Sequence, residues 1–387
     1  MQKVLIIGDG IVANCTAIML INNGFKPVLA TFNSDSHEKK HEKKIDRFFS
    51  INLLSKIFFQ KYGIWQGIAD DAVVPYNKII TWDSLQDEEV NFESREISHK
   101  FLGYIISESA LTKSIAAILD ESNIKKKNFN ENELLLNEYV LSDLENTGTN
   151  NYDYVIRTKN NDLFEKEFSK SSVTDYKQKA FVMNVCTKTK TNHIAFQKFS
   201  NGQIFGLLPI EENKYNLIWS MNSDLHKKIN TLDTSKIIDT LNREISDQIG
   251  IVDKISEPIT FPLFGYMTKL VSKNRVINIG SALHSVHPLA GLGLNMGIQD
   301  LFILNKIIEK NNQFIDQSSL KKFSSQITGI NKKIYHTINF LKYFYSDLTF
   351  SKTLRKISLI AFNRNSMLKK SIIRNATGLD TFEIFNK

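Results

Sequence analysis

The stretch that decides the fold is Arg275-Val-Ile-Asn-Ile-Gly-Ser-Ala-Leu-His-Ser-Val-His-Pro-Leu-Ala-Gly-Leu-Gly-Leu-Asn-Met-Gly-Ile-Gln-Asp300. It begins as a short apolar strand, Val276 to Ile279, and continues through a loop whose last part holds Gly291 and Gly293. Apolar residues then return at helical spacing. A strand, a glycine-rich turn and a helix together bring unpaired backbone N–H groups and a helix dipole against an anionic or electron-rich ligand. The stretch therefore predicts a ligand-binding turn.

A second stretch of the same kind opens the chain. Residues 3–7 have the pattern of a buried strand, Gly8-Asp-Gly10-Ile-Val-Ala13 that of a turn, and an apolar helix and a second strand follow. This order is the dinucleotide-binding fingerprint, with Ala13 in the place of its third glycine; the alternative is an ordinary tight turn. The acidic residue that would hold the ribose falls on Thr31, which hydrogen-bonds more weakly. Two such turns at opposite ends of the chain suggest one long ligand between them.

Composition sets the broad class of the protein. With 387 residues, of which 42% are hydrophobic, the chain is long enough for two connected folded domains. Its two cysteines, Cys15 and Cys186, do not suggest a disulfide framework, so we expect a reducing, cytoplasmic location. We find no secretory signal and no apolar run that could span a bilayer. The net charge of +8 leaves nucleic acid or an anionic membrane surface open as partners.

The middle of the chain alternates in the manner of β-strands. Apolar and aromatic residues recur through residues 78–82, 88–92 and, most clearly, 175–222, which predicts an antiparallel sheet. That sheet is either the floor of an apolar pocket or a plain structural core. Before it, Asp46-Arg47 introduces a predicted amphipathic helix through Ile51 and Phe58. Arg47 either holds a pyrophosphate or makes a surface ion pair; spacing alone does not separate the two.

From Ser318 the chain is predicted to be helical and basic. Lysines and arginines are interleaved with aromatic and aliphatic residues as far as Arg374, with Asp347 the only acid among them. The pattern is typical of helices on a membrane surface, and equally of helices that pack on the body and expose a basic face. No nucleic-acid motif accompanies the charge, so no nucleic-acid role is expected. His37 and His41 lie in a mixed-charge loop, and we predict no metal site.

Together these residues resemble the FAD-dependent aromatic hydroxylases of ubiquinone biosynthesis, within the para-hydroxybenzoate-hydroxylase-like flavin monooxygenases. The resemblance runs nearly end to end. Its most specific part is the run from His287 to Gly297 that closes on Asp300. The other matching segments are Gly8-Asp-Gly10, Asp46-Arg47, Leu102-Gly-Tyr-Ile-Ile106 and Asp175-Tyr-Lys-Gln178.

The resemblance implies both a cofactor and a reaction. FAD would be reduced by NAD(P)H and would react with O2 to form a C4a-hydroperoxide, which hydroxylates the ring of a polyprenyl-phenol. Because the flavin carries this chemistry, no catalytic side chain is predicted. The residues expected to bind FAD are Gly8, Gly10, Ile11, Val12, Ala13, Thr31, Arg47, Ser281, Pro288, Gly291, Gly293, Leu294 and Asn295.

It also implies an α/β fold, in which a Rossmann-like FAD-binding domain is interleaved with an antiparallel β-sheet substrate domain. The expected FAD-binding domain comprises residues 1–72, 101–174 and 266–315. The expected substrate domain comprises residues 73–100 and 175–265. Basic C-terminal helices follow over residues 316–387, with peripheral contact to the inner face of a membrane and to a quinone-synthesis complex as expected partners.

The chain departs from the family pattern where polar groups would hold FAD. Arg157-Thr-Lys-Asn160 replaces an Ala-Asp-Gly motif, Ser281 an Asp or Asn, and Leu292 a Gln, while Ser107-Glu108-Ser109 lacks an Asn and an Arg. Each lost neutral hydrogen bond costs about 0.5–1.5 kcal/mol, so several together would weaken FAD binding by several powers of ten. Three hypotheses follow: an FAD monooxygenase at a membrane surface, a degenerate homologue that serves as a lipid-binding or scaffolding subunit, and a hydroxylase of a soluble aromatic.

Overall fold

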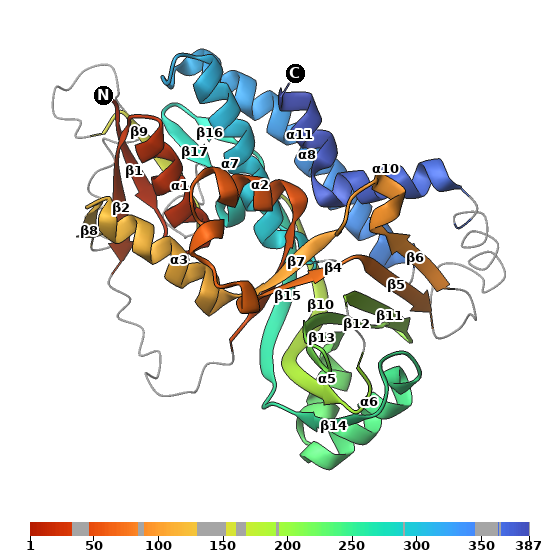
Figure 1. The fold of residues 1–387 in the computed structure, drawn as a ribbon. Helices are drawn as coiled ribbons and strands as arrows, with labels where there is room; N and C mark the ends of the chain where they lie inside the picture. The colour runs from red at the N-terminus through yellow and green to blue at the C-terminus, as the bar shows by residue number, and fades with distance from the viewer. Residues whose placement is uncertain are drawn as a thin grey trace.

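The computed structural model describes residues 1–32, 46–83, 89–129, 152–159, 168–190, 193–288, 291–344, 363 and 365–386. A mainly parallel sheet with its helices forms one part of the molecule, and a mainly antiparallel sheet forms the other (Figure 1). The histidines at 37 and 41 lie outside the described residues.

The first sheet contains the chain's N-terminal strand. Its strand order is β16 (Ser272–Lys273), β17 (Val276–Asn278), β9 (Tyr154–Arg157), β1 (Lys3–Ile7), β2 (Lys26–Phe32) and β8 (Lys125–Phe129). All pairs are parallel except β16 with β17. Helices covering a parallel sheet bury its strands, which explains why β1 is an unbroken apolar run. The predicted βαβ unit at the start of the chain is therefore confirmed, with α1 (Ile11–Asn22) between β1 and β2.

The second sheet holds the strands predicted from the alternating pattern. Its strand order is β18 (His284–Ser285), β15 (Ile259–Thr268), β10 (Lys170–Thr187), β13 (Lys214–Asn222), β12 (Gln203–Glu211), β11 (Ile194–Ser200), β5 (Lys78–Asp83) and β6 (Glu89–Glu93), and β14 (Val252–Ile255) pairs with β10. Neighbouring pairs are antiparallel except β11 with β5. Two helices that the strand pattern did not predict, α5 (Ser223–Asn230) and α6 (Thr234–Ile249), pack on this sheet.

A small third sheet corrects one prediction. Residues 48–52 form strand β3 (Phe48–Asn52), which pairs with β7 (Gly103–Ser107), and β7 pairs in turn with β4 (Val73–Tyr76). The predicted helix after Asp46-Arg47 was wrong in its start, because the backbone of residues 48–52 is used in this pairing. Helix α2 (Leu53–Lys61) begins only after Asn52, whose side chain accepts a hydrogen bond from the Ser55 N–H at 2.9 Å.

Five further helices complete the described residues. They are α3 (Glu108–Glu121), α7 (Leu292–Lys310), α8 (Gln317–Phe344), α10 (Ser366–Thr377) and α11 (Leu379–Asn386), and short 3-10 turns lie at Trp65–Gly67, Asp70–Ala72, Ser94–Ile97 and Gly280–Ala282. The C-terminal helices contact the N-terminal part of the chain. There the Asn52 Nδ2 donates a hydrogen bond to the carbonyl of Ala376 at 3.0 Å. The prediction of C-terminal helices is confirmed for the described residues.

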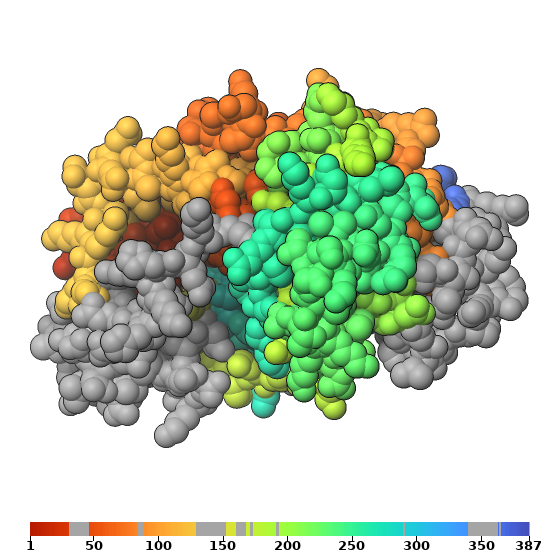
Figure 2. Space-filling view, turned by 90° about the horizontal axis from the view of Figure 1, so that it is seen from below, coloured from red at the N-terminus to blue at the C-terminus, as the bar shows by residue number. Residues whose placement is uncertain are grey.

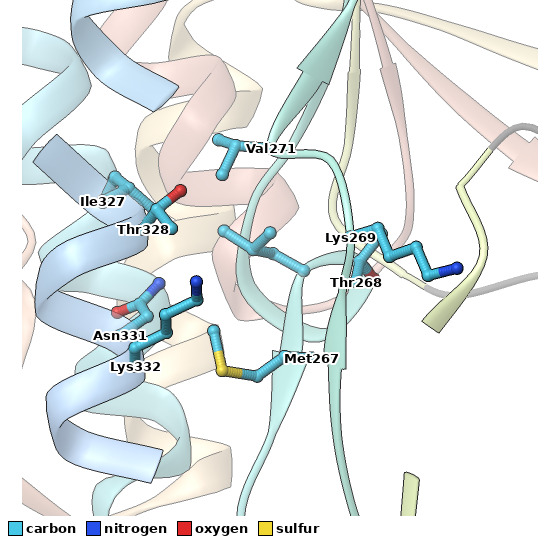
Figure 3. Close-up of a pocket in the computed structure, with 9 residues that line it drawn as sticks. Met267, Thr268, Lys269, Val271, Ile327, Thr328, Asn331 and Lys332 are labelled. Atoms are coloured by element: carbon cyan, nitrogen blue, oxygen red, sulfur yellow. The ribbon is translucent and has the colours of Figure 1, made fainter. Parts of the chain in front are cut away.

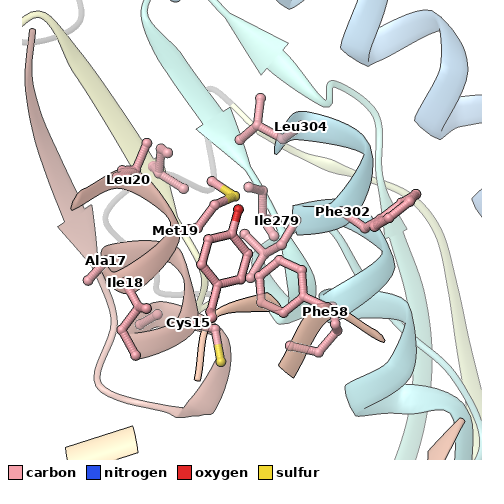
Figure 4. Close-up of a cluster of buried hydrophobic side chains, with 14 of the residues drawn as sticks. Cys15, Ala17, Ile18, Met19, Leu20, Phe58, Ile279, Phe302 and Leu304 are labelled. Atoms are coloured by element: carbon pink, nitrogen blue, oxygen red, sulfur yellow. The ribbon is translucent and has the colours of Figure 1, made fainter. Parts of the chain in front are cut away.

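The largest apolar core joins segments from both ends of the sequence. Cys15 and Met19 of α1 pack with Phe58 of α2 and with Ile279 and Phe302 near and in α7 (Figure 4). Burial raises the pKa of the Cys15 thiol well above its usual value. Both cysteines are free. This core fixes α1 against α7, and so fixes the two predicted ligand turns relative to each other.

Candidate flavin site

The first turn requires glycine at one position and leaves open space at another. Gly8 has a φ of +143°, and a Cβ there would lie 2.2 Å from the hydroxyl oxygen of Thr158. Gly10 has an ordinary φ of −87°, and a Cβ there would meet nothing within 4 Å. Gly8 therefore shapes the turn, whereas Gly10 keeps the backbone accessible to a ligand.

The second turn packs directly on the first. A Cβ on Gly297 of α7 would lie 2.8 Å from Val12 Cγ2 and 3.4 Å from the Cα of Gly280, and Val12 also lies close to Gly280. The hydroxyl of Ser281 donates to the carbonyl of Thr158 at 2.9 Å, which ties this turn to the end of β9. The two glycine-rich turns, far apart in the sequence, therefore form one site.

The helices that start at these two turns lack side-chain caps among the described residues. Helix α1 begins after Gly10 and α7 after Gly291, which has a φ of +62°, and neither start has a side-chain cap hydrogen bond or an acid in its first turn. Six other helices are capped by side chains, namely those of Asn52, Ser107, Asn222, Asp233, Asp316 and Asn365. First-turn N–H groups without a cap favour negative charge, reinforced by the helix dipole. These residues fit FAD: the start of α1 suits a pyrophosphate, and the start of α7 suits the electron-rich edge of a flavin.

The other predicted residues of the turns contribute mainly backbone. Ile11 and Ala13 are buried in the core, and Val12, Pro288 and Leu294 are half-buried. A Cβ on Gly293 would meet nothing within 4 Å, so the second turn is also open.

Thr31 is the next-to-last residue of β2 and lies in register with Asn128 of β8. Its side chain is outside those that the structure describes. Its position at the carboxyl end of a parallel strand is where the ribose contact is predicted.

The Asn295 side chain connects α7 to β3 and α2 through hydrogen bonds. Its Oδ1 accepts hydrogen bonds from the backbone N–H of Asn52 at 3.0 Å and from the hydroxyl of Ser55 at 2.9 Å. Its Nδ2 donates to the carbonyl of Ser50 at 2.7 Å. The side chain is only 3% exposed. It therefore holds α7 against β3 and α2 and has no free polar atom for a ligand.

Arg47 forms the ion pair that was one of its two predicted alternatives. Its Nε donates to the carboxylate of Glu108, at the start of α3, at 2.6 Å. This hydrogen bond raises the pKa of Arg47 above its ordinary value, and burial opposes the shift. The guanidinium is half exposed, so a phosphate could still reach it.

A buried carboxylate supports the second turn, and sequence reasoning gave it no role. Asp300 is fully buried and accepts hydrogen bonds from the Gly280 N–H at 2.9 Å and the Asn331 side-chain amide at 3.1 Å. His284 Nε2 lies 2.7 Å from the same carboxylate. Asp300 thus joins α7, α8 and the strand-to-helix loop. Its place at the end of the most specific stretch was the available signal.

In the segment that replaces the family's Ala-Asp-Gly motif, the Arg157 side chain is buried and the Lys159 side chain is exposed. Arg157 is 1% exposed, donates to Asn278 Oδ1 at 3.0 Å and lies 5.1 Å from the ring of Phe168. Burial lowers its pKa to about 10, so it stays charged at neutral pH. The Lys159 ammonium instead lies 3.9 Å from the carboxylate of Asp9, inside the first glycine turn.

The antiparallel sheet approaches the second turn through Tyr176 and His287. Their rings are 5.1 Å apart and nearly perpendicular, and His287 Nε2 lies 3.2 Å from Gln178 Oε1. The Tyr176 hydroxyl donates to Asn339 of α8 at 2.8 Å. Burial, the largest cause, raises the pKa of Tyr176 to about 12, so the phenol is neutral at physiological pH. Next to it an apolar cluster joins β11, β12, α7 and α8 through Phe199, Ile204, Val286, Leu292, Ile334 and Ile338.

A separate small cavity lies between the end of β15 and α8 (Figure 3). It has a volume of about 110 Å³, and Met267, Thr268, Ile327 and Asn331 are among its lining residues. The buried Oδ1 of Asn331 has no hydrogen-bond partner among the described residues. Because small-molecule sites usually measure about 300–1,000 Å³, this cavity has room for water rather than for a flavin.

The view from below shows the face of the molecule that carries α3, β8 and β15 (Figure 2). Atoms of the N-terminal segment lie at the bottom of a recess between the gold α3–β8 segment and the teal β15 region.

Within the described part of the chain, no group of three or more histidines, cysteines and acids is placed to hold a metal. Among the same residues no helix has both the length and the apolarity to cross a membrane.

Comparison with known proteins agrees with this geometry. An FAD binding domain model matches residues 157–334. The ubiquinone hydroxylase UbiM of Neisseria meningitidis is 24% identical over 97% of this chain and 85% of its own length. The 3-demethoxyubiquinol 3-hydroxylase of Escherichia coli is 20% identical over 97% and 98%, respectively. The crystal structure of p-nitrophenol 4-monooxygenase PnpA from Pseudomonas putida superposes with a TM-score of 0.68 at 13% identity, covering 100% of this chain and 99% of that one.

The solved structure shares this fold and the family model matches an FAD binding domain, so the predicted α/β fold class and FAD cofactor are confirmed. Within this class, the resemblance to the hydroxylases of ubiquinone biosynthesis is confirmed over nearly the whole chain. The domain boundaries and the individual FAD contacts remain predictions.

Proposed function

We propose that this protein is an FAD-dependent monooxygenase that hydroxylates the aromatic ring of a polyprenyl-phenol precursor of ubiquinone, with NAD(P)H as reductant and O2 as oxidant. The observation that carries the proposal is the packing of two uncapped, glycine-started helices into one site. Bound FAD would supply the redox and oxygen chemistry. The relatives named above are hydroxylases of ubiquinone biosynthesis, which supports the substrate class.

In this proposal the chain's own groups bind, orient and stabilise charge. The first-turn N–H groups of α1 receive the pyrophosphate beside Gly10, and those of α7 face the flavin edge that becomes negative on reduction. Asp300 and Asn295 keep α7 in place through hydrogen bonds to Gly280 and to the β3–α2 segment. Fixed donors of this kind need no rearrangement when charge develops.

The proposed substrate side is the apolar cluster next to Tyr176 and His287. Phe199 and Ile204 come from the antiparallel sheet and Leu292 from the start of α7, so sheet and flavin turn meet at this cluster. Leu292, where the family pattern described above has a Gln, makes the start of α7 more apolar. A prenylated phenol would gain from such burial, at about 25 cal/mol per Å² of apolar surface.

A peripheral membrane contact and a place in a quinone-synthesis complex belong to the same proposal. On α10, Met367 is 78% exposed and Leu368 45% exposed, and Lys370 is exposed beside them. Exposed apolar residues together with a cation suit the boundary of an anionic bilayer. Without this membrane contact, the proposed enzyme would be a hydroxylase of a soluble aromatic compound.

The deciding experiment is the visible spectrum of the purified protein before and after FAD is added and the excess removed. Retained flavin, followed by NAD(P)H oxidation and a mass gain of one oxygen in a short-chain prenyl-phenol, supports the proposal. A colourless protein that binds the prenyl-phenol without oxidising NAD(P)H contradicts it and favours the scaffolding subunit. Repeating the assay with anionic vesicles, and with a non-prenylated phenol, separates the membrane-bound from the soluble version.

A further inference from the structure

The end of β9 places a cation above the first glycine turn, in the segment that replaces the family's Ala-Asp-Gly motif. Strands β9 and β1 run parallel with Arg157 in register with Ile7. The Thr158 N–H donates to the carbonyl of Ile7 at 2.9 Å, which pins the end of one strand to the other. Continuing this register sets Lys159 beside Asp9, and their charged groups are 3.9 Å apart.

This ion pair is loose and exposed to solvent. The Lys159 and Asp9 side chains are 67% and 68% exposed. Exposed pairs of this kind contribute little, with a median of about 0–1 kcal/mol. Separating them therefore costs little, and the Lys159 ammonium is free to take a better acceptor. A pyrophosphate at the start of α1 would be such an acceptor, because charge-assisted bonds to phosphate oxygens are about twice as strong as neutral ones.

Asp9 makes the cation necessary. It stands inside the turn that receives the phosphates, and its carboxylate would repel them. The Lys159 ammonium, 3.9 Å from this carboxylate, partly offsets its charge.

We propose that Lys159 is a pyrophosphate-binding residue of this chain, and that FAD binding exchanges its partner from Asp9 to a phosphate oxygen. This inference rests on the proposed function, since it assumes that FAD occupies the glycine turns. It accounts for FAD binding in spite of the departures at Thr31, Ser281 and the Ala-Asp-Gly motif: one charged contact replaces several neutral ones.

The test measures binding of FAD and of riboflavin, which lacks the pyrophosphate, to the full-length apoprotein by flavin fluorescence. Lys159→Met is expected to raise the Kd for FAD roughly tenfold, or about 1.4 kcal/mol, and to leave the Kd for riboflavin unchanged. Lys159→Arg keeps the charge and should stay within about threefold of the wild type, whereas Asp9→Asn should bind FAD more tightly. Salt should weaken FAD binding less in Lys159→Met than in the wild type.

The matched control is Lys190→Met. Lys190 pairs with Glu212 on the antiparallel sheet, and the two side chains are exposed to 70% and 59%, much like Lys159 and Asp9. An equal FAD affinity in Lys159→Met, Lys190→Met and the wild type overturns the inference and leaves the proposed function intact. An equal loss of FAD and riboflavin affinity also overturns it, because that result indicates a distorted turn. Absence of FAD binding in the wild type rejects both the inference and the proposed function.

Discussion

Two glycines in one turn, Gly8 and Gly10, have different physical roles. At Gly8 an alanine would meet the Thr158 hydroxyl at 2.2 Å with a φ of +143°, whereas at Gly10 it would meet nothing. We expect Gly8→Ala to lower the free energy of unfolding by about 1–3 kcal/mol, the usual range for a strained backbone position. Urea denaturation measures the loss.

Gly10→Ala provides the comparison for this prediction. It should leave the free energy of unfolding nearly unchanged but weaken FAD binding, because its methyl group would fill the space kept for the ligand. Equal stability of the two variants would contradict the assignment of separate roles.

The buried carboxylate of Asp300 gives a second prediction at this scale. Asp300→Asn presents N–H groups where His284 and the Gly280 N–H need an acceptor, so one buried donor loses its partner. We expect a loss of about 1–3 kcal/mol in the free energy of unfolding, again from urea denaturation. A variant as stable as the wild type would mean that the loop does not depend on this carboxylate.

Single residues also show where sequence reasoning stopped. Gly8, Gly10 and Gly291 were identified because the spacing of glycines in a turn is a local signal. Asn295 holds α7 in place through hydrogen bonds to residues 240 or more positions away in the sequence. Asp300 depends on Asn331, which lies in a different helix. No local pattern encodes such partners.

Among the elements, α8 and α6 share one kind of N-terminal cap. Asp316 accepts a hydrogen bond from the Ser319 N–H, which is the largest cause lowering the pKa of Asp316 to about 2. Asp233 caps α6 through the Lys236 N–H, and its pKa is also about 2. A carboxyl group whose pKa is lower in the folded than in the unfolded protein stabilises the fold at pH values above its unfolded-state pKa, which is near 4. This stabilisation is lost as the pH falls through the folded-state pKa of about 2.

The prediction is that the first turn of α8 loses protection from hydrogen exchange between about pH 4 and pH 2. Asp316→Asn should remove this dependence in α8 only, and Asp233→Asn in α6 only. Protection factors, corrected for the intrinsic exchange rate at each pH, measure the effect. A loss that spreads to both helices in either variant would indicate global acid unfolding instead.

The elements also separate the successful predictions from the wrong one. The βαβ unit was predicted because its apolar strand, glycine turn and helix are all local signals. Residues 48–52 were misread because Ile51 and the apolar residues of α2 share a helical spacing, whereas pairing with β7 decides their conformation. Helices α5 and α6 carried usable signals, since Asn222 and Asp233 are good caps and apolar residues recur every four positions from Ile237.

Across the whole molecule, α8 links the two sheets. It supports Asp300 through Asn331 and reaches β10 through the bond from Tyr176 to Asn339. A double-mutant cycle of Tyr176→Phe and Asn339→Ala should give a coupling energy of about 0.5–1.5 kcal/mol in urea denaturation. Tyr176→Phe combined with Lys190→Met, a distant site, should be additive. A coupling near zero in the first cycle would remove this link between the sheets.

The architecture as a whole was more predictable than its junctions. Two glycine turns, an alternating middle and a helical end predicted the main kinds of element, and the family resemblance implied that they form an α/β protein with an interleaved sheet. The meeting of sheet, α7 and α8 at Tyr176, Leu292 and Asn339 was not predictable, because it depends on how three distant segments pack.

The distance in sequence between Gly10 and Gly291 has a consequence for how the protein is made. During synthesis the first turn leaves the ribosome early, but the second, and Asn331 that supports it, emerge only near the end. A site formed by both turns therefore exists only after α7 has been made, so a cofactor bound across both cannot guide the first folding of the nascent N-terminal part. Until release, the strand pairing of β1 with β2 and the apolar face of α1 would stand without α7 to cover them.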